Sequence, residues 1–362
     1  MRRSHAATIL PCCFFSLTFG SPASTFARPP SQVNEKERGI ELYRKGAFSE
    51  AVEALKEAVK KQQKDSDAWY YLGLSLHRAG NIKDARKAFE KTISLRPDFA
   101  PSYTAMAYMQ LLNYDDKGAM KNAEKAVALD PKNFESLYIA GMARLRQKQA
   151  AEALAKAEAA LKIKTDYPQA LMLKTESLIS LFAQEWDKQI KSQDRRKESK
   201  SPGDADGEEE KRSDYSLLKA ASESLEAYLK LNPGQSEQSF WSEQLEALRY
   251  YGSRAESSAS DKPLTNEPVT SMTPASKPKV LYRERAQYTE AARNAGVRGT
   301  VVLMVVFTDE GVLKYILALQ GLSHGLTGQA IAAARKIRFT PAMRDGKPLS
   351  VIGSLEFTFN LY

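Results

Sequence analysis

The chain offers few side chains that could carry out chemistry. Of its three histidines, only His77 and His324 lie outside the N-terminal segment, and they are far apart in the sequence. Ser323 is adjacent to His324, but adjacency does not make a nucleophile–base pair, and no third group is evident. We find no metal-ligand spacing, phosphate-binding loop or nucleophile elbow. We therefore predict no catalytic residue, no metal site and no cofactor, and thus a protein that is not an enzyme.

The first 27 residues have the layout of a secretory signal peptide. Two arginines precede an apolar run over residues 6–19, and Thr25 and Ala27 stand at the −3 and −1 positions of a cleavage site. As a helix the 14-residue run spans about 21 Å, which is short of the ~30 Å hydrocarbon core of a bilayer. We predict a cleaved signal at residues 1–27 and a periplasmic protein. The alternative is an uncleaved anchor in the inner membrane.

Both cysteines, Cys12 and Cys13, lie inside that apolar run. Pro11 precedes Cys12 and the position is early, whereas an acylated cysteine follows a small residue near the end of the run. After cleavage the chain would hold no cysteine, hence no disulfide and no thiolate ligand. The net charge is +9, but most of the Lys and Arg residues alternate with Glu along expected helix faces and do not form a basic stripe. We therefore predict no nucleic-acid partner.

The elements that could position a binding site follow a 34-residue period. Gly39, Gly73, Ala107 and Gly141 are each 34 residues apart. An alanine follows each of them by twelve residues; these are Ala51, Ala85, Ala119 and Ala153. Small residues at fixed places allow two helices to pack closely, and Pro97 and Pro131 end helices because proline lacks the N–H. The period predicts stacked helix pairs.

This pattern resembles the tetratricopeptide repeat. The clearest unit is "DAWYYLGLSLHRAGNIKDARKAFEKTISLRP", residues 67–97. It matches the family at Trp69, Leu72, Gly73, Gly80, Ala85, Phe89 and Pro97. The resemblance implies an all-α solenoid, which we place at residues 33–252.

A fifth repeat is interrupted. Its first helix is expected from Pro168 to about Trp186, and its second from Tyr215 to Leu231. Between them, residues 190–214 are highly charged and nearly free of apolar side chains, which predicts a disordered insertion. Gln238–Tyr251 is the expected closing helix.

The resemblance implies a concave groove that binds peptides. The family's clamp for a peptide carboxylate uses Lys, Asn and Arg; Lys36 matches it, but Tyr71 and Ala105 stand where polar donors are needed. The predicted groove residues are Tyr43, Tyr70, Tyr71, Leu74, Tyr108, Tyr138 and Met142. Such side chains suit a partner with apolar anchors. The alternative for each tyrosine is packing between helices.

The character of the sequence changes after residue 252. Residues 253–278 are rich in Ser, Thr and Pro, which predicts a flexible linker. Beyond it we expect a helix at Thr289–Asn294, a hairpin of Thr300–Thr308 and Val312–Gln320, and a helix capped by Thr327. The last strand, residues 351–361, alternates apolar and polar side chains. The order predicts a small α+β domain with a three-stranded antiparallel sheet.

Residues 279–362 resemble the C-terminal domain of TonB-family energy transducers. The motifs occur in family order as "YTEAAR" (288–293), "RGTVVLMVVF" (298–307), Gly311, "RKIRFTP" (335–341) and "GKP" (346–348). In that family an extended peptide from an outer-membrane transporter adds to a sheet edge. The resemblance implies partner contacts at Gln287, Tyr288, Ile352, Ser354, Glu356, Thr358 and Asn360. The physical basis would be β-augmentation.

Two departures from that family bear on function. A transducer has an N-terminal anchor with a histidine inside the span, whereas His5 precedes the apolar run here. The long Pro-rich segment of the family is replaced by repeats and a short linker. We therefore predict an adaptor that binds proteins or peptides of the cell envelope, outer-membrane transporters among them. The alternatives are a membrane-anchored energy transducer and, for the tail, a sheet edge that is covered by a second copy of the chain in a homodimer or by the repeat domain.

Overall fold

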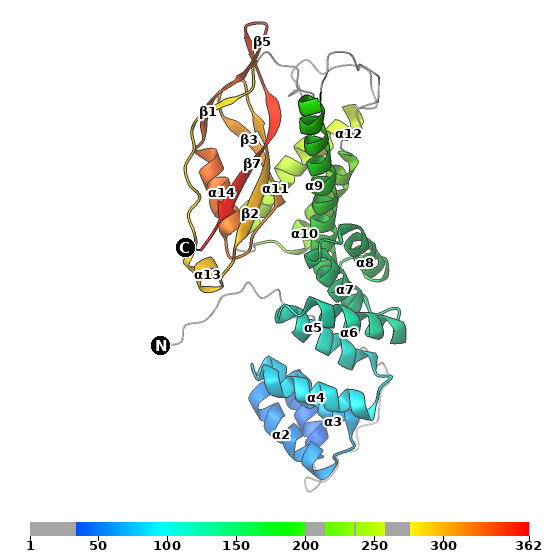
Figure 1. Ribbon diagram of the computed structural model, residues 1–362. Helices are drawn as coiled ribbons and strands as arrows, with labels where there is room; N and C mark the ends of the chain where they lie inside the picture. Colours follow the sequence, from blue (N-terminus) through cyan, green and yellow to red (C-terminus); the bar gives the residue numbers. More distant parts are fainter. Residues whose placement is uncertain (1–33, 200–213, 235–236, 258–275, 362) are drawn as a thin grey trace. The chain divides into compact units, whose positions relative to one another are not determined.

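The computed structural model describes residues 34–199, 214–234, 237–257 and 276–361 (Figure 1). The predicted signal peptide at 1–27 and residues 258–275 of the predicted linker lie outside the described residues. The chain divides into two compact units, Met1–Met106 and Ala107–Tyr362.

The first unit holds two helix pairs and the start of a third. The pairs are α1 (Glu35–Arg44) with α2 (Phe48–Lys61) and α3 (Ser66–Arg78) with α4 (Ile82–Leu95). Within each pair a glycine of the first helix faces a large side chain of the second. A Cβ on Gly39 would lie 2.4 Å from Cγ of Leu55, and a Cβ on Gly73 would lie 2.7 Å from Cε1 of Phe89. The repeated glycines are thus required for close helix contact.

The second unit continues the helix pairs. Its helices are the remainder of α5 (Ala100–Leu112), α6 (Asp116–Leu129), α7 (Phe134–Arg146), α8 (Ala150–Ile163), α9 (Pro168–Ser199), α10 (Ser216–Leu231), α11 (Gln238–Gly252) and α12 (Arg254–Ser257). Alanines fill the contact in the third pair, where Ala107 replaces the glycine and Ala123 is fully buried in the same cluster. A larger residue on the first helix is therefore matched by a smaller one on the second.

The fifth helix pair differs from prediction in one respect. Helix α9 does not stop near Trp186 but continues to Ser199, so the first part of the predicted disordered insertion is helical. Residues 200–213 lie outside the described residues. The long charged end of α9 has no apolar periodicity, which is why the sequence alone placed its end too early.

The tail contains the predicted sheet. Strands β2 (Gly299–Phe307), β3 (Leu313–Gln320) and β7 (Val351–Phe359) form an antiparallel sheet in the order β3-β2-β7. The register of β2 with β7 runs without interruption from Gly299↔Phe359 to Phe307↔Val351. The pairing of β2 with β3 shifts between Met304 and Val306, and Tyr315 in that stretch has a positive φ of 50°. Strands β3 and β7 are the two edges.

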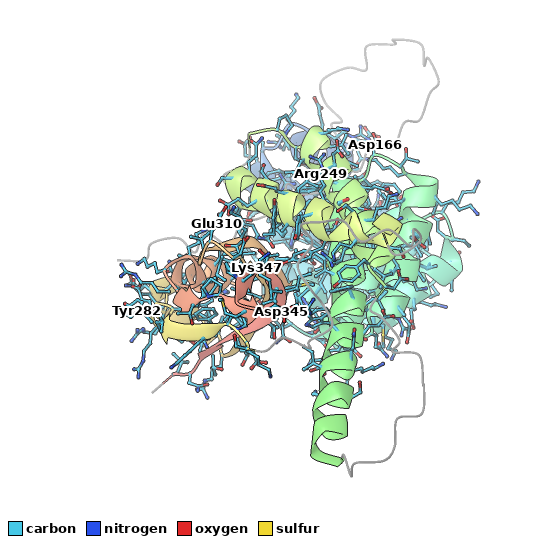
Figure 2. All side chains as sticks on the ribbon, turned by 90° about the horizontal axis from the view of Figure 1, so that it is seen from above. Asp166, Arg249, Tyr282, Glu310, Asp345 and Lys347 are labelled. Carbon is cyan, nitrogen blue, oxygen red and sulfur yellow. The ribbon has the colours of Figure 1, made fainter. Side chains whose placement is uncertain are left out.

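Two shorter ribbons complete the tail. Strand β1 (Lys279–Tyr282) pairs with β4 (Arg338–Thr340), and β5 (Ala342–Arg344) pairs with β6 (Lys347–Leu349). The turn between β5 and β6 is at Asp345–Gly346, and both residues have positive φ, 50° and 75°. Figure 2 shows Asp345 and Lys347 near this turn.

Helices cover both faces of the sheet. Helices α13 (Glu290–Asn294) and α14 (Leu326–Arg335) pack on the face that carries Val301, Leu303 and Phe357. The prediction that Thr327 caps α14 is wrong: the helix begins at Leu326, and the Thr327 hydroxyl donates to the carbonyl oxygen of Leu322 at 2.9 Å. That bond anchors the loop before the helix instead.

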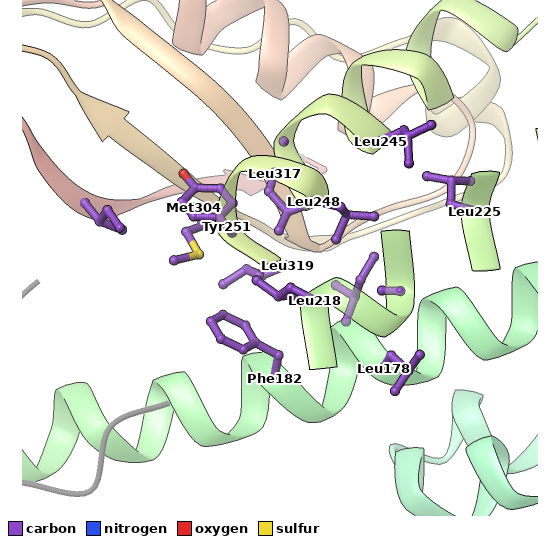
Figure 3. Close-up of a cluster of buried hydrophobic side chains, with 14 of the residues drawn as sticks. Leu178, Phe182, Leu218, Leu225, Leu245, Leu248, Tyr251, Met304, Leu317 and Leu319 are labelled. Carbon is purple, nitrogen blue, oxygen red and sulfur yellow. The ribbon is translucent and has the colours of Figure 1, made fainter. Parts of the chain in front are cut away.

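The other sheet face packs on the last helices of the repeats. Met304, Leu317, Leu319 and Ile352 belong to one buried cluster with side chains of α9, α10 and α11 (Figure 3). Among the helical members are Leu178, Phe182, Leu218, Leu225, Leu245, Leu248 and Tyr251. The repeats and the tail domain therefore share a hydrophobic core inside the second unit.

Candidate functional site

The predicted groove residues of the first unit separate into packing and accessible side chains. Tyr70 is 6% exposed, and its ring contacts Phe99 edge-on at a centroid distance of 5.0 Å. Tyr43 and Tyr71 are partly exposed and meet edge-on at 5.9 Å. Leu74 is also partly exposed. The packing alternative thus describes Tyr70, while Tyr43, Tyr71 and Leu74 keep accessible surface.

The lysine that matched the carboxylate clamp already has partners. Lys36 Nζ lies 2.8 Å from Oδ2 of Asp65, and the other oxygen, Oδ1, accepts the backbone N–H groups of Asp67 and Ala68 at the start of α3. Burial of Asp65 raises its pKa, but the bonds from Lys36 and from the backbone outweigh this effect, and the net pKa is lowered. Lys36 therefore joins the first two helix pairs.

In the second unit the predicted groove residues separate in the same way. Tyr138 is 8% exposed and lies edge-on to Tyr167 at 5.8 Å, whereas Tyr108 and Met142 remain partly exposed. Glu176 of α9 was not predicted from sequence. Burial raises its pKa to about 7, while the charge of Arg146 acts in the opposite direction.

The predicted contact residues of β7 do not form one open surface. Ser354, Glu356, Thr358 and Asn360 are exposed as expected. Ile352 is only 8% exposed and packs against α9 to α11, so the alternation in the sequence assigned it wrongly to a solvated face. The helices cover the sheet at the Ile352 end and leave the Thr358 end open.

Of the two predicted contact residues before α13, Gln287 and Tyr288, one packs against the sheet. Gln287 is exposed, but Tyr288 lies edge-on to Phe359 at 5.7 Å, and its hydroxyl donates to the carbonyl oxygen of Val297. Tyr288 thus holds the segment against β7. It contributes to a binding surface only through the part of its ring that stays exposed.

The edge at β3 is closed by α11. The amide nitrogen of Gln244 donates to the carbonyl oxygen of Ile316 at 3.1 Å, and its amide oxygen accepts the N–H of Ala318 at 2.9 Å. These two groups are the ones that an added strand would use on this edge. The Tyr251 hydroxyl donates to the carbonyl oxygen of Tyr315 at 2.9 Å. A pairing strand would have to displace α11.

The edge at β7 borders a cleft. The cleft has a volume of about 530 Å³ and lies between the segment 283–288 and the end of β7. Its lining includes Arg283, Arg285 and the stretch Glu356–Asn360. The guanidinium of Arg283 donates to the carbonyl oxygen of Glu356 and lies 4.5 Å from the ring centroid of Phe357. The sequence motif began at Tyr288 and therefore did not point to Arg283.

The one adjacent pair that could resemble a nucleophile and base is on the surface. Ser323 Oγ lies 2.8 Å from Nδ1 of His324, and both side chains are exposed in the loop before α14. His77, in contrast, is in α3 of the first unit, where burial lowers its pKa. In the part of the chain that the structure describes, no group of three or more His, Cys, Asp or Glu side chains is placed to hold a metal ion.

Among the described residues, none of the helices combines the length and the apolar character that a bilayer crossing requires. The N-terminal apolar run lies outside this set.

Two family models match the chain. A tetratricopeptide repeat model matches residues 36–100 and 104–169. This match covers the helix pairs from α1 to the start of α9. A second model, described as the C-terminal region of Gram-negative bacterial TonB protein, matches residues 284–361. The chain therefore carries tetratricopeptide repeats followed by a C-terminal domain of the TonB family, and both are families of protein-interaction domains.

Curated relatives match over part of the chain. The Hsp70-Hsp90 organizing protein of Triticum aestivum is 27% identical over 109 residues, which are 30% of this chain and 19% of the relative. The Hsp70-Hsp90 organizing protein 2 of Arabidopsis thaliana is 28% identical over 103 residues, which are 28% of this chain and 18% of the relative. The matched region thus spans about a fifth of the length of these relatives.

Solved structures align with part of the chain. Pseudomonas aeruginosa PilF aligns with a TM-score of 0.45 at 13% identity, covering 62% of this chain and 86% of PilF. MamA aligns with a TM-score of 0.40 at 17% identity, covering 56% of this chain and 95% of MamA. Similarity at this level carries no information about partners.

Proposed function

We propose that this protein is a non-enzymatic adaptor of the cell envelope, in which the repeat groove holds one protein and the TonB-family domain docks on another. The proposal keeps the predicted arrangement of signal peptide (1–27), repeats (33–252), linker (253–278) and tail domain (279–362). The tail's partner would be an extended peptide of an envelope protein, with outer-membrane transporters as the first class to test. The TonB-family match and the signal-like N-terminus support a periplasmic location.

One observation carries the docking proposal: only one edge of the sheet is accessible. Gln244 and Tyr251 occupy the β3 edge, whereas β7 borders the cleft. A peptide could therefore add to β7, where main-chain hydrogen bonds would supply affinity and side chains would supply selectivity. Ser354, Glu356, Thr358, Asn360 and Gln287 are the side chains that we propose to contact it, with the exposed part of Tyr288.

The backbone geometry gives a sharp test of this edge. Successive residues of an antiparallel strand direct their N–H and C=O groups to opposite sides, so residues two apart share a side. Because the carbonyl of Glu356 faces Arg283 and not β2, the N–H groups of Ser354 and Thr358 face the open side too. Thr358→Pro would remove one such N–H and leave the bonds to β2 in place. Proline is tolerated on edge strands for this reason.

The experiment places a photo-crosslinking residue at Ser354 of the full-length protein in cells. We expect a crosslink to a single envelope protein, which is lost with Thr358→Pro and retained with Thr358→Ala. The same crosslinker at Asp345, in the exposed turn, is the spatial control. A crosslink that survives Thr358→Pro would refute docking on β7.

The location is tested on the same cells. Mass spectrometry of the mature N-terminus should find a chain that begins at Arg28, recovered in the periplasmic fraction. An intact N-terminus in the inner-membrane fraction would instead support the membrane-anchored energy transducer.

A further inference from the structure

The open edge of the sheet is partly occupied by a side chain of the protein itself. Arg283 lies just after β1, and its guanidinium donates to the carbonyl oxygen of Glu356. That carbonyl is one of the acceptors that an incoming strand would need. The guanidinium also lies over the ring of Phe357, 4.5 Å from its centroid, and this cation–π contact further stabilises the position of Arg283. Arg283 thus competes with any strand that adds to β7.

The charges that line the cleft are unevenly neutralised. Glu284 points its carboxylate to Lys336, with 2.9 Å between Nζ and Oε2, so its charge is compensated. No acidic side chain among the described residues lies within ion-pair distance of Arg283 or Arg285. The carboxylate of Glu356 is on the opposite sheet face from Phe357 because neighbouring strand residues alternate. The mouth of the cleft therefore presents two arginines without a counter-ion.

These contacts lead to an inference about the partner's chemistry. We propose that the β7 edge takes an extended peptide that bears a carboxylate, and that this carboxylate draws Arg283 away from the carbonyl of Glu356 as the peptide pairs. Arg283 then acts as a latch: it shields the edge in the free protein and becomes an ion-pair partner in the complex. The inference rests on the proposed docking at β7 and adds a charge preference to it.

A carboxylate is favoured over an apolar anchor at this point for a physical reason. Displacing Arg283 removes both a hydrogen bond to a carbonyl and a contact with an aromatic ring. An uncharged peptide replaces only the hydrogen bond to the carbonyl of Glu356. A carboxylate also accepts charge-assisted, bidentate hydrogen bonds from the displaced guanidinium of Arg283. Uncharged peptides should therefore bind, but more weakly.

The test uses purified full-length protein and a displayed library of random ten-residue peptides. We expect the selected peptides to be enriched in Asp or Glu at one position, and their binding to be lost with Thr358→Pro. One selected peptide is then synthesised with Glu and with Gln at that position. The wild type should prefer the Glu form by roughly threefold to tenfold, a preference that decreases as salt is raised.

The latch has a signature that a structural role would not produce. Arg283→Ala should weaken binding of the Glu peptide but strengthen binding of the Gln peptide, because the competitor for the carbonyl of Glu356 is gone. A structural defect would weaken both. Arg344→Ala, an exposed arginine of β5 outside the cleft, is the matched control and should change neither.

Each outcome has a defined meaning. If no selected peptide depends on the Thr358 N–H, the docking proposal itself fails. If peptides need that N–H but show no preference for Glu over Gln, docking stands and the latch is refuted. If the selected peptides only compete with a dimer detected by sedimentation, the edge belongs to a second copy of the chain, and the latch is refuted too.

Discussion

At the scale of single residues, the repeats depend on pairs of complementary size. Gly39 faces Leu55 and Gly73 faces Phe89, whereas Ala107 and Ala123 share a cluster in the third pair. The glycine is therefore needed where a large side chain packs on it, and at Gly141 that side chain is Leu173 of the following helix, α9, whose Cδ2 would lie 2.6 Å from a Cβ. The sequence period located these positions, but the partner of each could be identified only from the structure.

Gly73→Ala should destabilise the first unit. The new Cβ would lie 2.7 Å from the ring of Phe89, so a helix has to move or the ring has to turn. Overpacking of this kind typically costs about 1 to 3 kcal/mol. Chemical denaturation of the protein should show the loss, and a second substitution, Phe89→Leu, should recover part of it. Gly80→Ala is not a suitable control, because Gly80 has a positive φ of 83° and an alanine there would strain the backbone. Ala79→Gly at the same turn is the control for backbone effects.

Glu176→Gln should stabilise the second unit at neutral pH. The folded-state pKa of Glu176 is raised to about 7 from an ordinary value of 4.5. A raised pKa means that the stability is present below pH 4.5, where the group is neutral in both states, and is lost as pH rises through about 7. The pKa difference corresponds to about 3 kcal/mol, and since solvent reaches part of the side chain we expect roughly half.

The measurement is the free energy of unfolding at pH 4 and at pH 8. Glu176→Gln should raise it at pH 8 and leave it unchanged at pH 4. Glu185→Gln, on the exposed side of the same helix, should change neither value. An equal gain at both pH values would contradict a role for the charge.

At the scale of elements, one helix has two tasks. Helix α11 closes the repeats, as its sequence predicts, and it also completes the tail sheet by supplying Gln244 where a fourth strand would bond. The positive φ of Tyr315 belongs to the irregular stretch of β3, and its ring stacks on Tyr250 of α11 at 3.7 Å. The irregular stretch of β3 is therefore the part of the strand that packs against α11.

Gln244→Leu should loosen the contact between α11 and β3. The substitution leaves the carbonyl of Ile316 and the N–H of Ala318 without their present partners in a site where Gln244 is 3% exposed. Each unsatisfied group costs about 1 to 3 kcal/mol. Hydrogen exchange of the Ala318 amide should accelerate, and the free energy of unfolding should fall. Glu246→Leu, on the exposed face of α11, should leave the Ala318 amide protected.

At the scale of the whole molecule, local patterns predicted the repeat helices and the three-stranded sheet, and they left open whether a second copy or the repeat domain covers the sheet. The 34-residue period and the alternation in β7 are local patterns, and the helix pairs and the strand that they predict are confirmed. Ile352 was misassigned because alternation separates two faces but does not say that a distant helix covers one of them. Gln244 and Ile316 are 72 residues apart, and no periodicity connects them. For Tyr70 and Tyr138 the sequence left a groove role and packing between helices open, and their burial favours packing.

The shared core implies that the tail domain is not autonomous. A fragment of residues 279–362 would expose Met304, Leu317, Leu319 and Ile352, which are buried in the full chain. Exposed apolar patches of this kind promote association. We expect that fragment to aggregate or self-associate in light scattering, and the full-length protein to remain monodisperse. A monodisperse, cooperatively folding short fragment would show that the helices are dispensable.

The closed β3 edge also limits stoichiometry. A sheet with two open edges can accept a strand on each side, and a chain of such sheets can grow without end. Here Gln244 leaves β7 as the single place for pairing, so each molecule can accept one strand. Two molecules that met edge to edge would use up both β7 strands and stop at a pair. Helix α11, which packs on β3, thereby prevents the sheet from polymerising through this edge.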